Sequence, residues 1–132
     1  MRTRTFSVST HSRRVVDLTA EVRAFAAQAG GDGLLHVFVP HATAGVALIE
    51  TGNGSEADLE QALEHLLPRD DRYVHRHGST GHGGDHLLPA FVSPSLIVPV
   101  IDGKPALGVW QSVVLVDPNR DNDERTVRLS FL

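Results

Sequence analysis

The chain of 132 residues contains no cysteine. This absence excludes disulfide bonds, thiolate catalysis and cysteine-ligated zinc, so nitrogen and oxygen atoms must hold any bound metal. Aromatic residues make up only 5% of the chain, and the net charge is −4 with neutral histidines. Few aromatics and an acidic balance offer neither the stacking platform nor the basic surface of a nucleic-acid-binding protein. We therefore expect no nucleic-acid partner.

Long apolar runs are also missing, so no segment is expected to cross a bilayer. The first six residues, Met1 to Phe6, lack the apolar core of a secretory signal. Hydrophobic and charged residues, at 41% and 21%, are close to globular averages, and 132 residues suffice for one core. These features predict a cytoplasmic protein without a membrane partner, built as a single domain over residues 1–132.

Two helical patterns lie in the first half of the chain. Leu18, Val22, Phe25 and Ala29 recur at helical spacing after Asp17, which is suited to be an N-cap. In a second segment, Ser55 and Asp58 resemble a capping box, and Pro68 ends the pattern. Both segments predict amphipathic helices.

Strand patterns dominate the rest of the chain. The dipeptide Asp102-Gly103 predicts a hairpin turn, because both residue types tolerate a positive φ. Two early helices and mostly strands afterwards favour an α+β fold, or a sandwich-like antiparallel fold with helices at one side. The expected strands are 3–10, 34–39, 46–49, 96–101, 107–116 and 126–131.

The most informative feature is a group of histidines. Four of the eight, His75, His77, His82 and His86, fall in one glycine-rich polar segment, and His41 precedes a threonine-containing turn. Histidine is the commonest metal ligand and suits proton transfer near neutral pH. The pattern predicts a metal or acid/base site, and its alternative is a solvated histidine-rich loop.

The spacing within this segment favours two pairs. His75 and His77 share a face if the chain is extended, whereas His82 and His86 share a face if it is helical. Gly81, Gly83 and Gly84 argue against a regular helix but let the backbone fold tightly around an ion or anion. Asp85 could be a ligand or could orient one, although a turn residue is the more common role.

Other polar residues lie at the ends of expected strands. Thr43 could bind phosphate through its hydroxyl or could bond its own backbone as a turn residue. Glu50 could be a general base, or a solvent-facing residue at a strand end. In the expected strand 107–116, Trp110 and Gln111 alternate, so one of them could face a cleft, although a lone tryptophan in a strand is more often a core residue.

Several of these residues resemble the motifs of a known family. The segment Ser95 to Val113, which includes Asp-Gly-Lys-Pro-Ala-Leu-Gly-Val-Trp-Gln, resembles the signature of the YjbQ-like family. His41-Ala-Thr-Ala is similar to its His-Thr-Thr-Ala motif, Tyr73-Val-His75 to its Tyr-x-His, and His86-Leu to its later histidine. The motifs occur in the same order and cover nearly the whole chain. The family's Gly-Thr-Trp-Gln reads Gly-Val-Trp-Gln here.

The resemblance implies an α+β chain with a jelly-roll-like antiparallel sheet and two helices, assembled as a homotrimer around a divalent metal such as zinc. Carried over residue by residue, it implies His41, His75 and His86 as metal ligands. His77 and His82 match nothing fixed in the family pattern, so the resemblance does not implicate them.

The activity associated with the family is a secondary thiamine-phosphate synthase reaction, the transfer of a hydroxymethylpyrimidine group from its pyrophosphate to a thiazole phosphate. On this basis Glu50 and His41 are the candidate catalytic residues. Thr43, Trp110 and Gln111 are the candidate binding residues for a small phosphorylated metabolite.

Two departures weaken the enzymatic interpretation. The asparagines that flank the family's glutamate are Ile49 and Thr51 here, and a basic position after the later histidine is Leu88. The alternative is a non-catalytic trimer that binds a metal or a phosphorylated metabolite.

Overall fold

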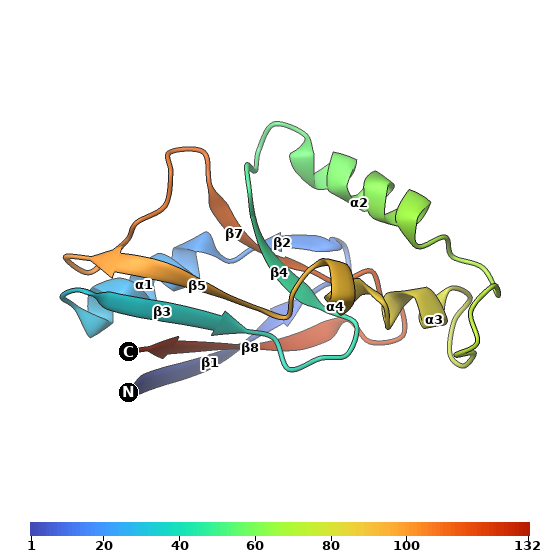
Figure 1. Cartoon of the computed structure of the whole chain (residues 1–132), viewed down its shortest axis with the longest axis horizontal. Helices are drawn as coiled ribbons and strands as arrows, with labels where there is room; N and C mark the ends of the chain where they lie inside the picture. Colours follow the sequence, from blue (N-terminus) through green and yellow to red (C-terminus); the bar gives the residue numbers. More distant parts are fainter.

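A computed structural model describes residues 1–132 as an α+β chain with two antiparallel sheets (Figure 1). In the larger sheet the strand order is β1-β8-β3-β5-β6, and in the smaller it is β2-β7-β4. The larger sheet contains β1 (Arg2–Ser9), β8 (Glu124–Phe131), β3 (Gly33–Phe38), β5 (Ser95–Ile101) and β6 (Lys104–Pro105). The smaller sheet contains β2 (Val15–Asp17), β7 (Ser112–Val116) and β4 (Gly45–Ile49).

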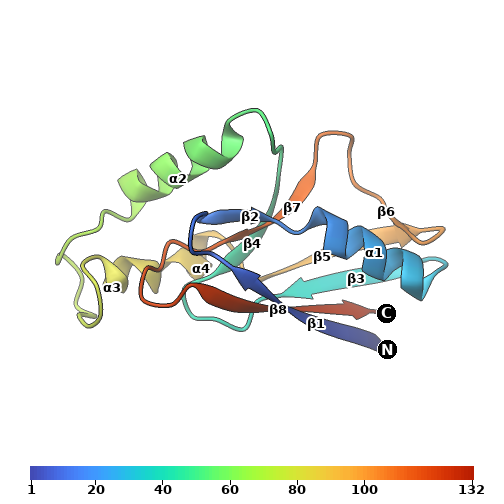
Figure 2. The ribbon, with the colours of Figure 1, turned by 180° about the vertical axis from the view of Figure 1, so that it is seen from behind.

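The two longer helices flank these sheets. Of the two short ones, α3 lies within the histidine-rich segment and α4 follows it. Helix α1 packs against β6, β7 and β8, and the view from behind shows it in front of β5 (Figure 2). Helix α2 stands at the opposite side of the molecule, above α3 and α4 (Figure 1). None of the four has the length and apolarity that a bilayer crossing requires. They are α1 (Thr19–Ala29), α2 (Ser55–Leu66), α3 (His82–Asp85) and α4 (Leu88–Phe91).

The main core lies between the two sheets and α1. Val22, Phe25 and Ala26 of α1 are buried, because residues three and four apart share one helix face. They meet the inward side chains of both sheets, including Leu35 and Leu115, which are fully buried. Burying each large apolar side chain contributes about 1.5–3 kcal/mol. The predicted α+β class is confirmed, and a jelly-roll connection of the strands stays a prediction.

A smaller cluster attaches α2 to the body. Leu59, Leu63 and Leu67 pack against the buried residues Val114 and Val116 of β7. No residue of α2 is itself buried, so this helix covers the cluster while its own side chains stay partly exposed to solvent.

Most predicted elements are confirmed with shifts of one or two residues at their ends. At the hairpin between β5 and β6, Asp102 and Gly103 both have positive φ, 48° and 71°, as the two-residue turn requires. Helix α1 begins one residue later than predicted, with Leu18 at the N-cap, while Asp17 accepts a hydrogen bond from the Thr19 amide.

Three local predictions are wrong. The capping box is absent, because Gly54 with a φ of 96° is the N-cap of α2 and Ser55 is already helical. The glycine-rich segment does form one helical turn, α3. The strand expected over 107–116 begins only at Ser112, and Trp110 lies in the preceding loop with 71% of its surface exposed.

Candidate metal centre

Four histidine side chains converge at α3 and the loop before it. The group comprises His75, His77, His82 and His86, and one ligand nitrogen from each lies within 4.8 Å of all the others. His82 is 9% exposed and His86 is half-buried, whereas His75 and His77 are exposed. We call these residues the four-histidine group. It unites the two pairs that the sequence spacing suggested.

The geometry of the group fits a metal ion with nitrogen ligands. The Nε2 atoms of His82 and His86 lie 2.8 Å apart, since His82 is the first residue of α3 and His86, one turn later, is its C-cap. Two nitrogens bound to one tetrahedral zinc ion lie about 3.3 Å apart. The two Nε2 atoms therefore need to move apart by only about half an ångström to bind an ion between them. The His75 ring centroid lies 4.5 Å from that of His86, and His77 lies 4.3 Å from His82.

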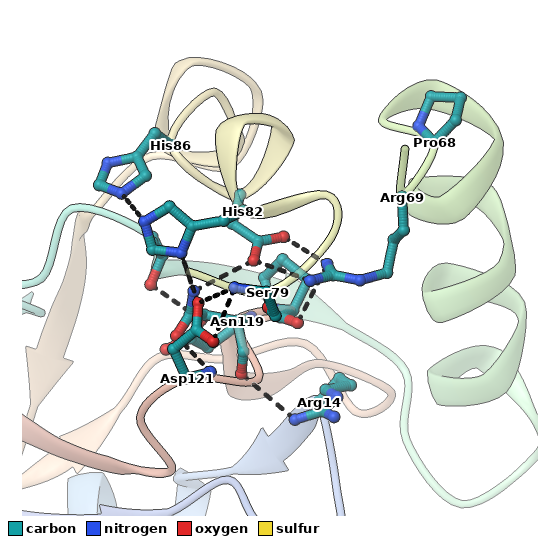
Figure 3. A network of polar contacts seen from close by, with 12 residues as sticks. Arg14, Pro68, Arg69, Ser79, His82, His86, Asn119 and Asp121 are labelled. Atoms are coloured by element: carbon teal, nitrogen blue, oxygen red, sulfur yellow. Dashed lines mark hydrogen bonds and ion pairs between the residues drawn. The ribbon is translucent and has the colours of Figure 1, made fainter. Parts of the chain in front are cut away.

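A carboxylate fixes the orientation of His82. Asp121 Oδ2 lies 2.6 Å from His82 Nδ1 and the carboxylate also accepts the Ser79 amide hydrogen (Figure 3). The bond from Ser79, together with His82, holds the pKa of Asp121 below its usual value. Since an ionised carboxylate only accepts, Nδ1 of His82 carries the proton, and Nε2 presents its lone pair to the group.

Glycines allow the chain to fold so tightly here. Gly81 has a φ of 86° and begins α3, and a Cβ atom on Gly83 would lie 2.6 Å from Tyr73 Cβ and would collide with the His75 carbonyl oxygen. The Tyr73 hydroxyl donates to the Pro68 carbonyl oxygen at 2.7 Å. The glycines therefore place the segment carrying His75 directly against α3.

Behind α3 lies an ion pair that supports it. Arg69 donates both terminal nitrogens to the Asp85 carboxylate, at 2.5 and 3.1 Å, and reaches it from the end of α2 (Figure 3). Asn119 Nδ2 donates to the same carboxylate at 3.1 Å and lies 3.2 Å from His82 Nδ1. Asp85 therefore acts as an anchor for α3, which is more than the turn residue expected.

A second buried network continues from Asn119 into the sheets. Asn119 Oδ1 accepts from Arg125, and Arg125 is paired with Asp117. Thr43 donates its hydroxyl hydrogen to Asp117 at 3.0 Å. Burial raises the pKa of Asp117, although Arg125 and two further hydrogen bonds oppose this. The Thr43 hydroxyl is thus engaged inside the protein.

His41 lies beside this second network and outside the four-histidine group. Its Nε2 accepts the backbone N–H of Thr126 at 2.8 Å, so the neutral ring carries its proton on Nδ1. Burial and the charge of Arg125 lower the pKa of His41. The structure brings together His75 and His86 of the ligand set implied by the resemblance and leaves His41 apart.

Burial also lowers the pKa of His86, and the neighbouring histidines add to the effect. A histidine must be neutral to bind a metal ion. His86 is therefore ready to act as a ligand at a lower pH than an ordinary histidine.

The remaining candidate residues lie at the other end of the smaller sheet. Ile49 of β4 pairs with Ser112 of β7. Glu50 directly follows Ile49 and Gln111 directly precedes Ser112, so both stand at the same end of these two strands. Asn53 donates to Glu50, and Gly108 donates its amide hydrogen to Gln111. The chain from Thr43 to Glu50 spans about 20 Å if it is extended. Within one chain, Glu50, Trp110 and Gln111 thus lie far from Thr43, which belongs to the second network.

Sequence reasoning missed the residues that support the site. Asn119 and Asp121 lie in the segment 118–123, whose composition predicts only a polar turn, and Asp117 directly precedes it. The one signal in the sequence is the number of carboxylates and amides over 117–123, and this composition does not indicate a contact with the histidines.

A protein-family model described as UPF0047 protein YjbQ-like matches residues 4–132. UPF0047 protein Rv2556c of Mycobacterium tuberculosis is 65% identical over 132 residues, which cover all of this chain and 98% of the relative. UPF0047 protein MJ1081 of Methanocaldococcus jannaschii is 30% identical over 115 residues, which cover 85% of this chain and 81% of the relative.

The fold also matches solved structures. The hypothetical protein APE1520 of Aeropyrum pernix K1 superposes with a TM-score of 0.90 at 33% identity, over all of this chain and 98% of that one. The conserved hypothetical protein TT1486 of Thermus thermophilus gives a TM-score of 0.82 at 29% identity, over 98% and 99% of the two chains.

Proposed function

The chain belongs to the UPF0047 family of YjbQ-like proteins, and starting from this membership we propose that it is a metal-dependent protein whose four-histidine group binds a divalent ion, with zinc the best fit. The single observation that carries the proposal is the convergence of four imidazole nitrogens within 4.8 Å. An all-imidazole donor set suits zinc, copper, nickel and iron, and tetrahedral coordination favours zinc.

The four histidines would have two different roles at this site. His82 and His86 form the fixed part, because α3 carries both and Asp121 holds the His82 ring. His75 and His77 are exposed, so one of them can leave its position to water or a substrate. When bound, the ion would polarise an oxygen atom or lower the pKa of a water molecule.

We further propose the transferase reaction that the family resemblance suggests. In that reaction the C–O bond of hydroxymethylpyrimidine pyrophosphate breaks, a C–N bond to the thiazole nitrogen forms, and pyrophosphate leaves. A polar cavity of about 210 Å³ beside the group supports this proposal, because its lining includes Arg76, His77 and the glycine-rich backbone of Gly78–Gly81. Backbone amides in such turns bind anions. The Ser79 amide already binds the Asp121 carboxylate, so Arg76 supplies the charge that a phosphate would meet. Thr43, which the sequence suggested for this role, is buried.

A non-catalytic metal site is the second candidate. It is favoured by the number of histidines, because four imidazoles fill a tetrahedral shell and structural zinc sites keep no open position. Removing His77 separates the two functions. Retained turnover in His77→Ala supports the catalytic site with an open position.

The metal assignment is tested by elemental analysis of the purified protein after removal of loosely bound ions. We expect close to one ion per chain in the wild type and in His65→Ala, whose histidine lies on the exposed side of α2. His82→Ala and His86→Ala should lose it. His41→Ala should retain it, and loss of metal in that variant would restore the ligand set that the family resemblance implies.

The transferase is tested by measuring pyrophosphate release from the two phosphorylated substrates. Release that requires both substrates and disappears in His86→Ala supports the enzyme. Full metal occupancy without any release leaves the metal-binding function standing and overturns the transferase.

We also propose that the chain is a homotrimer. Support comes from apolar side chains on the outer face of β3 and β5, where Leu34, Ile97 and Ile101 are exposed. Light scattering after size-exclusion chromatography measures the mass directly. A monomer at micromolar concentration would contradict the proposal.

A further inference from the structure

A cavity of about 240 Å³ lies between α2 and the connections that lead into β2 and out of β7. It is separate from the polar cavity at the histidines and has no role in the function proposed above. One side consists of a single face of α2, where Glu60, Leu63 and Glu64 lie three and four positions apart, and of Leu67, which caps the helix. The other side comes from segments 11–14 and 116–120.

The charges in this cavity are separated. Glu60 and Glu64 stand on the α2 side, whereas Arg14 and Arg120 stand on the opposite side. None of these four residues takes part in any of the ion pairs of the protein. Arg14 donates its Nη1 hydrogens only to the uncharged carbonyl oxygens of Thr10 and Asn119.

The other two charged residues at the cavity already satisfy each other. Arg69 and Asp85 form an ion pair, and Asn119 occupies a further position on the Asp85 carboxylate. The Arg14 backbone N–H donates to Glu60 Oε1 at 2.9 Å, so the two sides meet at Glu60. The guanidinium groups of Arg14 and Arg120 and the Glu64 carboxylate have no ionic partner. A ligand that carries both a negative and a positive group can pair with both kinds of charge at once.

The remaining lining is apolar. Its hydrophobic residues are Leu63 of α2, Leu67 at the C-cap of that helix and Val116 at the end of β7. Small-molecule sites combine such apolar surface with a few convergent polar groups. We propose that the cavity binds a small zwitterion, an α-amino acid with an apolar side chain. Its carboxylate pairs with Arg14 and Arg120, its ammonium group with Glu60 and Glu64, and its side chain covers the three apolar residues.

The test uses L-leucine and two analogues that each lack one charge, 4-methylpentanoate and 3-methylbutylamine. Titration calorimetry on the metal-free protein makes the result independent of the metal site. We expect L-leucine to bind at least tenfold more tightly than either analogue. L-valine, L-methionine and L-phenylalanine complete the set of probes, and failure of all four amino acids to bind at millimolar concentration would overturn the proposal.

Two variants locate the binding. Arg120→Gln changes an exposed side chain and Glu64→Gln one on the solvated helix α2, so both are expected to fold. Each should weaken L-leucine binding at least tenfold, and Arg120→Gln should leave the affinity for 3-methylbutylamine unchanged. Arg128→Gln, an exposed arginine on β8, is the matched control. Equal binding of L-leucine and 4-methylpentanoate would show a site for carboxylates alone and contradict the zwitterion.

Discussion

Asp121 and His82 lie 39 positions apart in the sequence, yet Oδ2 of the one and Nδ1 of the other are only 2.6 Å apart. This hydrogen bond sets the tautomer of the most buried histidine of the group. It also connects the turn after β7 to the helix that carries two of the four candidate ligands. The bond makes Asp121 a positioning residue for the proposed metal centre.

Replacing Asp121 by asparagine keeps the shape of the side chain and removes its charge. We expect metal affinity to fall by about 10- to 100-fold, the usual effect of losing a partner of a ligating histidine. Competition with a coloured chelator measures the affinity. Asp123→Asn is the control, since Asp123 pairs only with the exposed His11. Equal affinities in the two variants would contradict a role for Asp121.

Adding one methyl group at Gly83 should also disturb the metal centre. In Gly83→Ala the new Cβ meets the His75 carbonyl oxygen and the Tyr73 side chain, so the segment with His75 must move away from α3. We expect weaker metal binding and a lower free energy of unfolding. In Gly108→Ala the new Cβ meets only the flexible end of Gln111. The same chelator titration and urea unfolding should therefore show almost wild-type behaviour for this control.

The buried pair Asp117–Arg125 should dominate the stability of the polar network. Arg125→Met leaves the Asp117 carboxylate buried without a counter-charge, which costs about 3–5 kcal/mol of the free energy of unfolding. Urea unfolding measures this loss. Arg4→Met, which removes an exposed pair with Glu21, should cost less than about 1 kcal/mol. A double variant with Asp117→Leu should recover most of the loss.

The pH dependence of stability should reflect His41. Its pKa in the folded protein is lowered by burial and by Arg125, so below the unfolded value of about 6.5 the unfolded chain binds more proton. The free energy of unfolding of the metal-free protein should therefore fall as the pH drops from about 7 to about 5. His41→Gln should make this fall shallower, whereas His65→Gln on α2 should not. An unchanged slope in His41→Gln would remove His41 as a cause.

Local patterns predicted most of the elements because their signals are local. The alternation in β1, the helical spacing in α1 and the Asp102-Gly103 turn each depend on neighbouring residues, and all three are found. The prediction for the glycine-rich segment failed because contacts with residues outside it determine its conformation. The helical turn α3 forms although it contains two glycines. Both are needed there, because Tyr73 and the His75 backbone occupy the space where larger side chains would stand.

At the candidate site, too, the sequence indicated what depends on local spacing and missed what depends on distant contacts. The spacing of the histidines alone placed His77 and His82 with His75 and His86, and the structure brings these four together. The family resemblance set His77 and His82 aside, since they match no fixed motif. Asn119 and Asp121 could not be found from the sequence, because their role depends on contacts with His82 across 37 and 39 positions.

All four histidines of the group come from one short stretch, residues 75–86. A set of ligands so close together along the chain remains within reach of one ion after the protein unfolds. The unfolded chain should therefore keep part of the metal affinity, and metal should raise the melting temperature less than the native affinity alone would give. The share of affinity that belongs only to the folded state comes from the residues outside the stretch that hold the rings in place, among them Asp121 and Arg69.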